Sequence, residues 1–86
     1  MPSQKKAANV VGPQVQRLRY ELELTQEQFA ARCQVAGLDI SRSTLAQIEA
    51  QLRCVTDKEL FLLSRVLAVS TEHLFPAEMR RKKRLK

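Results

Sequence analysis

The chain has 86 residues, of which 44% are hydrophobic and only two are glycines. That length is enough for one small domain with one modest core, and it excludes a second domain of ordinary size. No apolar run approaches the ~20 residues that a membrane-spanning helix needs. The hydrophobic periodicity is helical along the whole chain, so we expect an all-α protein.

The formal net charge of +6 is concentrated at the two ends of the chain. Residues 10–78 contain seven basic and nine acidic side chains, which gives this stretch a net charge of −2. Lys5, Lys6 and the six basic residues from Arg80 to Lys86 supply the excess. The overall basicity is therefore weak evidence for what the folded part of the chain binds.

Charge and periodicity together divide the chain into three parts. Residues 1–9 are polar and show no periodicity, so we expect a flexible N-terminal arm. Residues 10–78 carry the helical pattern and form the domain. Residues 79–86 are dominated by one sign of charge, and we expect them to be a basic, solvated C-terminal tail.

Neither cysteine suggests a metal site, because Cys33 and Cys54 lack C-x-x-C spacing and His73 is the single histidine. We interpret both as reduced thiols that act as small apolar side chains in a cytoplasmic protein, since no signal peptide precedes them. One disulfide between them is the alternative. No paired carboxylates share a predicted face and no nucleophile has a neighbouring histidine, so we predict no enzyme, metal or cofactor.

The first predicted helix begins at Gly12-Pro13, where the missing N–H of proline costs nothing. It ends near Leu24, and its apolar residues at i, i+3 and i+7 predict one buried stripe of Val15, Leu18 and Leu22.

The second predicted helix begins after Thr25, which forms a capping box with Gln28 three residues later. The helix continues to about Ala36, where Gly37 offers the left-handed residue that often follows a helix. A short connection over residues 38–40 follows it.

Ser41 is the cap of the third predicted helix. Its apolar residues at i, i+3 and i+7 are expected to face the core; they are Leu45, Ile48 and Leu52. The opposite face is small or polar and consists of Arg42, Ser43, Ala46, Gln47 and Ala50.

The fourth predicted helix begins with a capping box between Thr56 and Glu59. Its apolar stripe is broad and contains Leu60, Leu63 and Leu67, flanked by Phe61, Leu62 and Val66. Ser70 caps a short fifth helix, which Pro76 ends.

The order of these five helices resembles the lambda-repressor/Cro-like (XRE) helix-turn-helix family between about Val11 and Phe75. Four motifs carry the resemblance: Leu24-Thr25-Gln26-Glu27, Ser41-Arg42-Ser43-Thr44, Ile48-Glu49 and Val69-Ser70-Thr71-Glu72-His73-Leu74-Phe75. The resemblance implies a compact five-helix DNA-binding bundle in which the second and third helices form the helix-turn-helix. It also implies sequence-specific binding of double-stranded DNA, with the third helix in the major groove.

The resemblance implies roles for individual residues as well. Gln26 corresponds to a residue that binds a phosphate at a helix N-terminus. Arg19 and Glu49 correspond to an ion pair that joins the first and third helices. The DNA contacts implied on the third helix are base-facing Arg42, Ser43, Ala46 and Gln47, with Ser41 and Thr44 as caps or backbone contacts.

Arg53 lies just beyond the third helix and is a candidate phosphate contact by its position. For Arg53, as for each of the DNA-facing residues above, the alternative is an ordinary solvated side chain.

The chain departs from the family pattern between the second and third helices. The spacing from the cap Thr25 to the cap Ser41 is longer than usual by about five residues, which we interpret as an extra helical turn and a longer connection. Glu23 and Gln34 also stand where the family often has glycine.

We therefore hypothesise a bacterial or phage transcriptional regulator in the cytoplasm, associated with the nucleoid. It would be a repressor of phage or mobile-element type that acts as a homodimer on two half-sites. The candidate dimer contact is the surface near Leu74, Phe75 and Met79. The alternative is a protein-interaction module such as an antitoxin, which the near-neutral charge of residues 10–78 favours.

Overall fold

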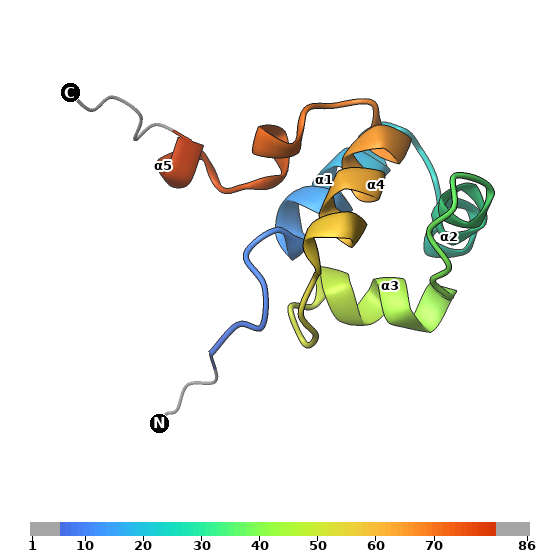
Figure 1. The fold of residues 1–86 in the computed structure, drawn as a ribbon, viewed down its shortest axis with the longest axis horizontal. Helices are drawn as coiled ribbons and strands as arrows, with labels where there is room; N and C mark the ends of the chain where they lie inside the picture. The colour runs from blue at the N-terminus through green and yellow to red at the C-terminus, as the bar shows by residue number, and fades with distance from the viewer. Residues whose placement is uncertain (1–5, 81–86) are drawn as a thin grey trace.

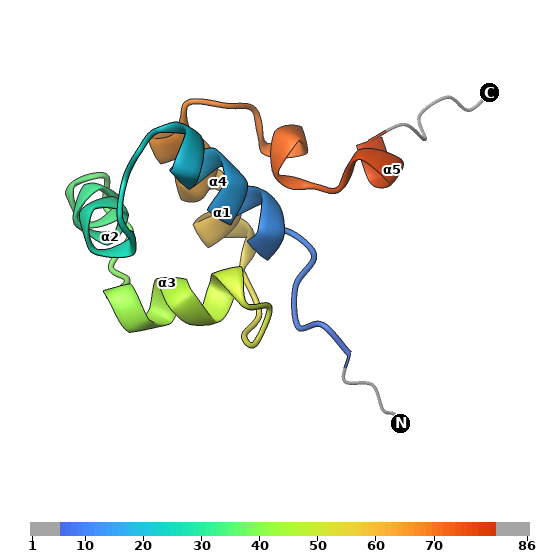
Figure 2. The same cartoon turned by 180° about the vertical axis from the view of Figure 1, so that it is seen from behind.

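The computed structural model describes residues 6–80, and this part of the chain is all-α (Figure 1). Helices α1 and α4 lie next to each other in the middle of the bundle, α3 crosses one end of it, and α2 closes one side (Figures 1 and 2). The elements are α1 (Gly12–Glu21), α2 (Gln26–Val35), α3 (Arg42–Glu49), α4 (Asp57–Leu67), the 3-10 helix η1 (Thr71–Leu74) and α5 (Ala77–Arg80). The predicted all-α helix-turn-helix bundle is confirmed, and α5 adds one further turn after Pro76.

One hydrophobic core joins the inward faces of α1, α2, α3, α4 and η1. Its largest fully buried side chain is Phe29 of α2, which no solvent reaches. The other buried apolar residues are Val11, Val15, Ala30, Cys33, Leu38, Ile40, Leu45, Ile48, Leu63, Leu67 and Leu74. Because the connection between α2 and α3 supplies two of them, that connection is packed into the domain.

The starts of α2, α3 and α4 follow the predicted caps, whereas Ser70 makes no side-chain capping bond at η1, because its hydroxyl pairs with His73 Nδ1 at 2.8 Å instead. The Thr25 hydroxyl accepts from the Gln28 N–H at 3.0 Å, and the Gln28 side chain accepts from the Thr25 N–H at 2.9 Å. Thr56 and Glu59 form the same reciprocal pair at the start of α4. These caps were predictable because each involves residues only three apart in the sequence.

The ends of the helices share a left-handed residue, which the sequence predicted at only one position. A residue in the left-handed region follows each of the four α-helices from α1 to α4, at Glu23, Gly37, Gln51 and Ala68, with φ between 60° and 99°. The N–H of the next residue then bonds back to the last turn, as in Leu52 N–H to the Gln47 carbonyl at 2.8 Å. Glycine marks only one of these four positions.

Two residues predicted in buried stripes are therefore exposed. Leu22 is the C-cap of α1 and is 43% exposed, because the chain turns away at Glu23. Leu52 is 67% exposed, because α3 ends at Glu49 and the chain reverses at Gln51. In both cases the prediction continued the apolar spacing of the helix beyond the residue where the helix ends.

Two further predictions from apolar patterning hold only in part. Phe61, expected to broaden the α4 stripe, is exposed, and the Arg65 guanidinium lies over its ring at 5.5 Å. Cys33 is a buried free thiol whose pKa burial raises to about 11, whereas Cys54 is free and exposed. The interpretation as a packed apolar side chain is correct for Cys33 and wrong for Cys54.

The predicted boundaries also need correction at both ends. The expected flexible arm of residues 1–9 is too long, because Ala8 N–H donates to the Gln51 carbonyl at 3.0 Å and Asn9 is bonded to three backbone groups. The expected tail begins too early, because Met79 and Arg80 belong to α5. Residues 1–5 of the arm and 81–86 of the tail lie outside the described residues. Within residues 6–80, no helix has the length and apolar character to cross a membrane.

Candidate nucleic-acid interface

The helix-turn-helix consists of α2, the connection 36–41 and α3, which meet at one end of the bundle (Figure 1). Leu38 and Ile40 are buried, and the Gln34 side-chain amide donates to the Ile40 carbonyl at 2.8 Å. The connection is longer than the usual three or four residues, as predicted. Its two apolar anchors hold it against the core, so the added length does not leave α3 loosely attached.

Helix α3 has two clearly different faces. Leu45, Ile48 and Glu49 are buried on the inner face. On the outer face Arg42, Ser43 and Gln47 are exposed, and Ala46 is half-buried. The structure thus brings the four predicted base-facing residues together on one solvent-facing side of a single helix.

The start of α3 is organised by the hydroxyl groups of three residues. Ser41 Oγ accepts from the Thr44 N–H at 3.1 Å and lies 3.1 Å from Thr44 Oγ1, to which it can donate. Ser43 Oγ lies 3.5 Å from Ser41 Oγ. The predicted capping role of Ser41 is confirmed, and all these contacts lie within four consecutive residues.

Glu49, on the inner face, forms a buried ion pair with Arg19 of α1. Arg19 Nε donates to Glu49 Oε2 at 2.7 Å and Arg19 Nη2 donates to Glu49 Oε1 at 2.9 Å. The two side chains are only 5% and 2% exposed. A third bond, from Arg19 Nη1 to the Leu24 carbonyl at 2.8 Å, extends the network to the turn before α2.

This ion pair favours the charged form of Arg19 despite its burial. Hydrogen bonding to Glu49 raises the pKa of Arg19, against the opposing effect of desolvation. Arg19 also lies 4.6 Å from the centre of the Tyr20 ring. Because Arg19 binds both Glu49 of α3 and the carbonyl of Leu24 before α2, the pair sets the position of α3 relative to α1 and α2.

Gln26 takes part in the same network. Its side-chain amide donates to Glu49 Oε1 at 3.0 Å, so it is directed toward α3 and half-buried. The predicted phosphate contact of Gln26 remains a prediction. One of the two Nε2 donors is used in that bond, so the second donor and the backbone N–H groups at the start of α2 are what a phosphate would meet there.

Arg53, just after α3, is paired with Glu59 of α4. Its Nη1 donates to Glu59 Oε1 at 3.1 Å and its Nη2 donates to Glu59 Oε2 at 3.2 Å. Burial alone would raise the pKa of Glu59, but hydrogen bonds from Arg53 and Thr56 outweigh it and lower the pKa. The Arg53 side chain is 33% exposed. It is therefore an ordered cation beside the end of α3, and its contact with phosphate remains a prediction.

Sequence reasoning missed two residues at the other end of α3. Asn9 bonds to the Ile48 and Arg53 carbonyls, and Gly12 packs so closely that an added Cβ would lie 2.3 Å from the Ile48 carbonyl oxygen. Asn9 lies two residues before the N-cap position of α1, which Val11 occupies, so the usual capping signal does not point to it. No local pattern announces contacts with residues almost forty positions away.

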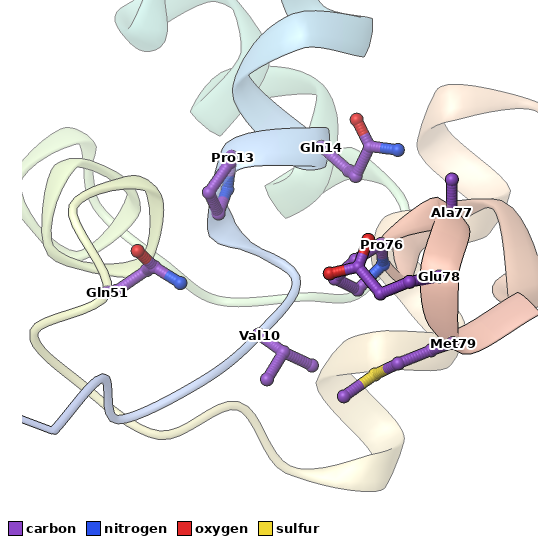
Figure 3. A pocket seen from close by; sticks show the side chains of 8 residues that line it. All are labelled: Val10, Pro13, Gln14, Gln51, Pro76, Ala77, Glu78 and Met79. Carbon is purple, nitrogen blue, oxygen red and sulfur yellow. The ribbon is translucent and has the colours of Figure 1, made fainter.

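A groove of about 520 Å³ lies between the start of α1 and α5, and Gln51, just after the end of α3, also lines it (Figure 3). The side chain of Met79 points toward Val10 across it. Both of these side chains are exposed, whereas Leu74 is completely buried and Phe75 is half-buried. The candidate dimer contact at Leu74 was therefore wrong, because that residue belongs to the core.

A family model described as helix-turn-helix matches residues 15–74, more than half of the chain. The chain belongs to the helix-turn-helix family of the XRE type. The protein is thus a DNA-binding transcriptional regulator, and its partner is double-stranded DNA.

Among solved structures, the helix-turn-helix protein is similar to a hypothetical transcription factor NHTF from Neisseria. The two share 18% identity with a TM-score of 0.72, over 95% of this chain and 90% of that chain. At this identity the likeness shows the fold alone. No curated protein matches the sequence.

Proposed function

We propose that the protein regulates transcription by placing α3 in the DNA major groove and reading base edges with its outer face. The observation that carries this proposal is the division of α3 into a buried inner face and an exposed outer face with Arg42, Ser43 and Gln47. The major groove admits one helix and presents a distinct pattern for each base pair. The inner face meanwhile anchors the helix to the domain.

The outer residues have distinct chemical capacities. Arg42 can donate two hydrogen bonds to guanine O6 and N7, and Gln47 can pair with adenine N6 and N7. Ser43 fits a base edge or a phosphate, and the methyl group of Ala46 fits a thymine methyl. Ser41 and Thr44 at the cap, Gln26 at the start of α2 and Arg53 after α3 would then face the DNA backbone.

One helix of eight residues reads only a few base pairs, so we further propose a homodimer on two half-sites about one helical turn apart. Since Leu74 is buried, the contact is proposed at the groove between Val10 and Met79 instead. Occlusion of a promoter by such a dimer would make the protein a repressor, of phage or mobile-element type.

Selection of binding sites from random DNA by the purified chain at physiological salt tests the proposal. The expected result is enrichment of one short sequence, repeated as an inverted pair. Enrichment of no sequence would overturn the base-reading function. Tight binding to a protein partner in that case, without measurable DNA affinity, would favour the protein-interaction module instead.

A further inference from the structure

The carboxyl-terminal end of α3 has carbonyl groups that need hydrogen-bond donors from outside the helix. The last carbonyl groups of any α-helix lack partners within that helix. The reversal at Gln51 covers part of this need, because Gln51 N–H donates to the Ile48 carbonyl at 3.0 Å. A single side chain, that of Asn9, donates a second bond to the Ile48 carbonyl and one bond to the Arg53 carbonyl, which lies just beyond the helix.

Asn9 makes three hydrogen bonds with its side-chain amide. Asn9 Nδ2 donates to the Ile48 carbonyl at 3.1 Å and to the Arg53 carbonyl at 2.8 Å. Asn9 Oδ1 accepts from the Gly12 N–H at 2.8 Å. The same side chain therefore accepts from the first N–H of α1 and donates to carbonyls at and just after the end of α3, which uses both of its donors and one acceptor site.

The surrounding backbone is built to bring these groups together. Gly12 has no Cβ, and one would lie 2.3 Å from the Ile48 carbonyl oxygen and 2.9 Å from that of Glu49. Gln51 Nε2 donates to the Asn9 carbonyl at 2.9 Å, and Ala8 N–H donates to the Gln51 carbonyl at 3.0 Å. Figure 2 shows the N-terminal segment running beside the turn that follows α3.

We propose that Asn9 is a positioning residue for DNA reading. It fixes the carboxyl-terminal end of α3 to the start of α1, and the ion pair of Arg19 with Glu49 fixes the inner face. This inference rests on the proposed function of α3 as the helix that reads bases. Asn9 itself touches no DNA in this account and acts through the angle of α3.

The effect on DNA binding depends on the fraction of molecules in which α3 has the orientation that binds DNA. A helix held in one orientation binds its site without first being ordered, whereas a helix with several orientations binds only from the competent fraction. Sequence-independent binding depends on phosphate contacts and is less sensitive to that angle. Loss of the two Asn9 donations should therefore lower the preference for the specific site more than the affinity for DNA in general.

The test compares three variants of the full chain. Asn9→Ser keeps a hydroxyl that can cap the Gly12 N–H but cannot span the two carbonyls, and Asn9→Ala removes both functions. Thr56→Ala is the control, because it removes a side-chain cap from α4 and leaves all three Asn9 bonds and the Arg53–Glu59 pair in place. Affinity is measured for the duplex selected by the wild-type chain and for a scrambled duplex, at a temperature where circular dichroism shows every variant folded.

Asn9→Ser and Asn9→Ala should each reduce the ratio of the two affinities by about tenfold, since two ordinary hydrogen bonds correspond to changes of that order. Thr56→Ala should leave the ratio within about twofold of wild type. If the Asn9 variants do not fold, Gln51→Ala removes only the bond to the Asn9 carbonyl and should reduce the ratio by about threefold.

A wild-type ratio in the Asn9 variants, together with a lost ratio in Gln47→Ala, would overturn the role of Asn9 and leave the proposed function standing. An equal loss in Thr56→Ala would overturn it too, because stability alone would then explain the effect. A wild-type chain that does not distinguish the two duplexes would overturn both proposals.

Discussion

The two ends of α3 are held in place by different means. At its start, the Ser41 side chain bonds only to groups within the next three residues. At its end, Glu49 and the Ile48 carbonyl are held by Arg19 and Asn9, which are 30 and 39 residues away in the sequence. One end is thus a local structure in solvent, and the other is the point where distant parts of the chain meet.

This difference teaches where specificity and stability reside in the helix. The start of α3 carries Arg42 and Ser43 and is free to face a ligand, because its backbone needs are met locally. The end of α3 contributes few exposed polar groups but determines how the whole helix lies on the domain. Substitutions at the end should therefore cost more stability than substitutions at the start.

The largest loss of stability is expected for Glu49→Ala. Removing one partner of a buried ion pair leaves the Arg19 charge uncompensated and costs roughly 3–5 kcal/mol. The free energy of unfolding measured in urea checks this value. Glu21→Ala is the matched control, because its pair with Arg17 is about half exposed and should contribute less than about 0.5 kcal/mol. Equal losses in the two variants would contradict the account.

Gly12→Ala should come next, with a loss of about 1–3 kcal/mol. The added methyl group would push α1 away from the Ile48 carbonyl, and overpacking of this kind has a cost of that size. Gly37→Ala provides the comparison, because no atom lies within 4 Å of its Cβ position and only the left-handed backbone opposes alanine. The thermal midpoints should therefore fall in both, and more in Gly12→Ala.

At the start of the helix, Ser41→Ala should cost about 1 kcal/mol, the ordinary loss for a helix N-cap. The change removes only local bonds, so it should not disturb the packing at the other end. Amide hydrogen exchange checks both points: the Thr44 N–H should lose protection, and the Gln51 and Leu52 amides should keep theirs. Loss of protection at Gln51 would mean that the two ends are not independent.

The smallest changes in stability are expected for glycine substitutions at two residues with a left-handed backbone conformation, Ala68 and Gln51. Ala68→Gly should stabilise the protein by about 1 kcal/mol, because glycine adopts this conformation without the cost that a Cβ brings. Gln51→Gly gains the same relief but loses the bond from Gln51 to the Asn9 carbonyl, so its net change should be close to zero. Equal gains in both variants would show that this bond contributes nothing.

Sequence reasoning predicted the features that short spacing defines. The caps at Thr25, Ser41 and Thr56, the left-handed Gly37 and the two faces of α3 all depend on residues within one or two turns. The ion pair of Arg19 with Glu49 came instead from the resemblance to a known family.

Features set by tertiary packing were not predictable in the same way. Leu52 was assigned to the core because nothing in the side chain of Gln51 announces a left-handed turn, and Leu74 was placed at a dimer surface although η1 buries it. Asn9 was assigned to a flexible arm because its partners lie across the domain. Such contacts depend on how the elements meet, which local pattern does not encode.

The central claim is that the outer face of α3 reads bases, and Gln47→Ala with Arg42→Ala tests it most directly. Affinity is measured for the selected duplex and a scrambled duplex at the same salt concentration, with Arg32→Ala on the exposed surface of α2 as the control. Each α3 variant should lose about 1–3 kcal/mol of discrimination between the two duplexes, while Arg32→Ala keeps it. Equal losses on both duplexes would contradict the claim, because the side chains would then serve only as general DNA contacts.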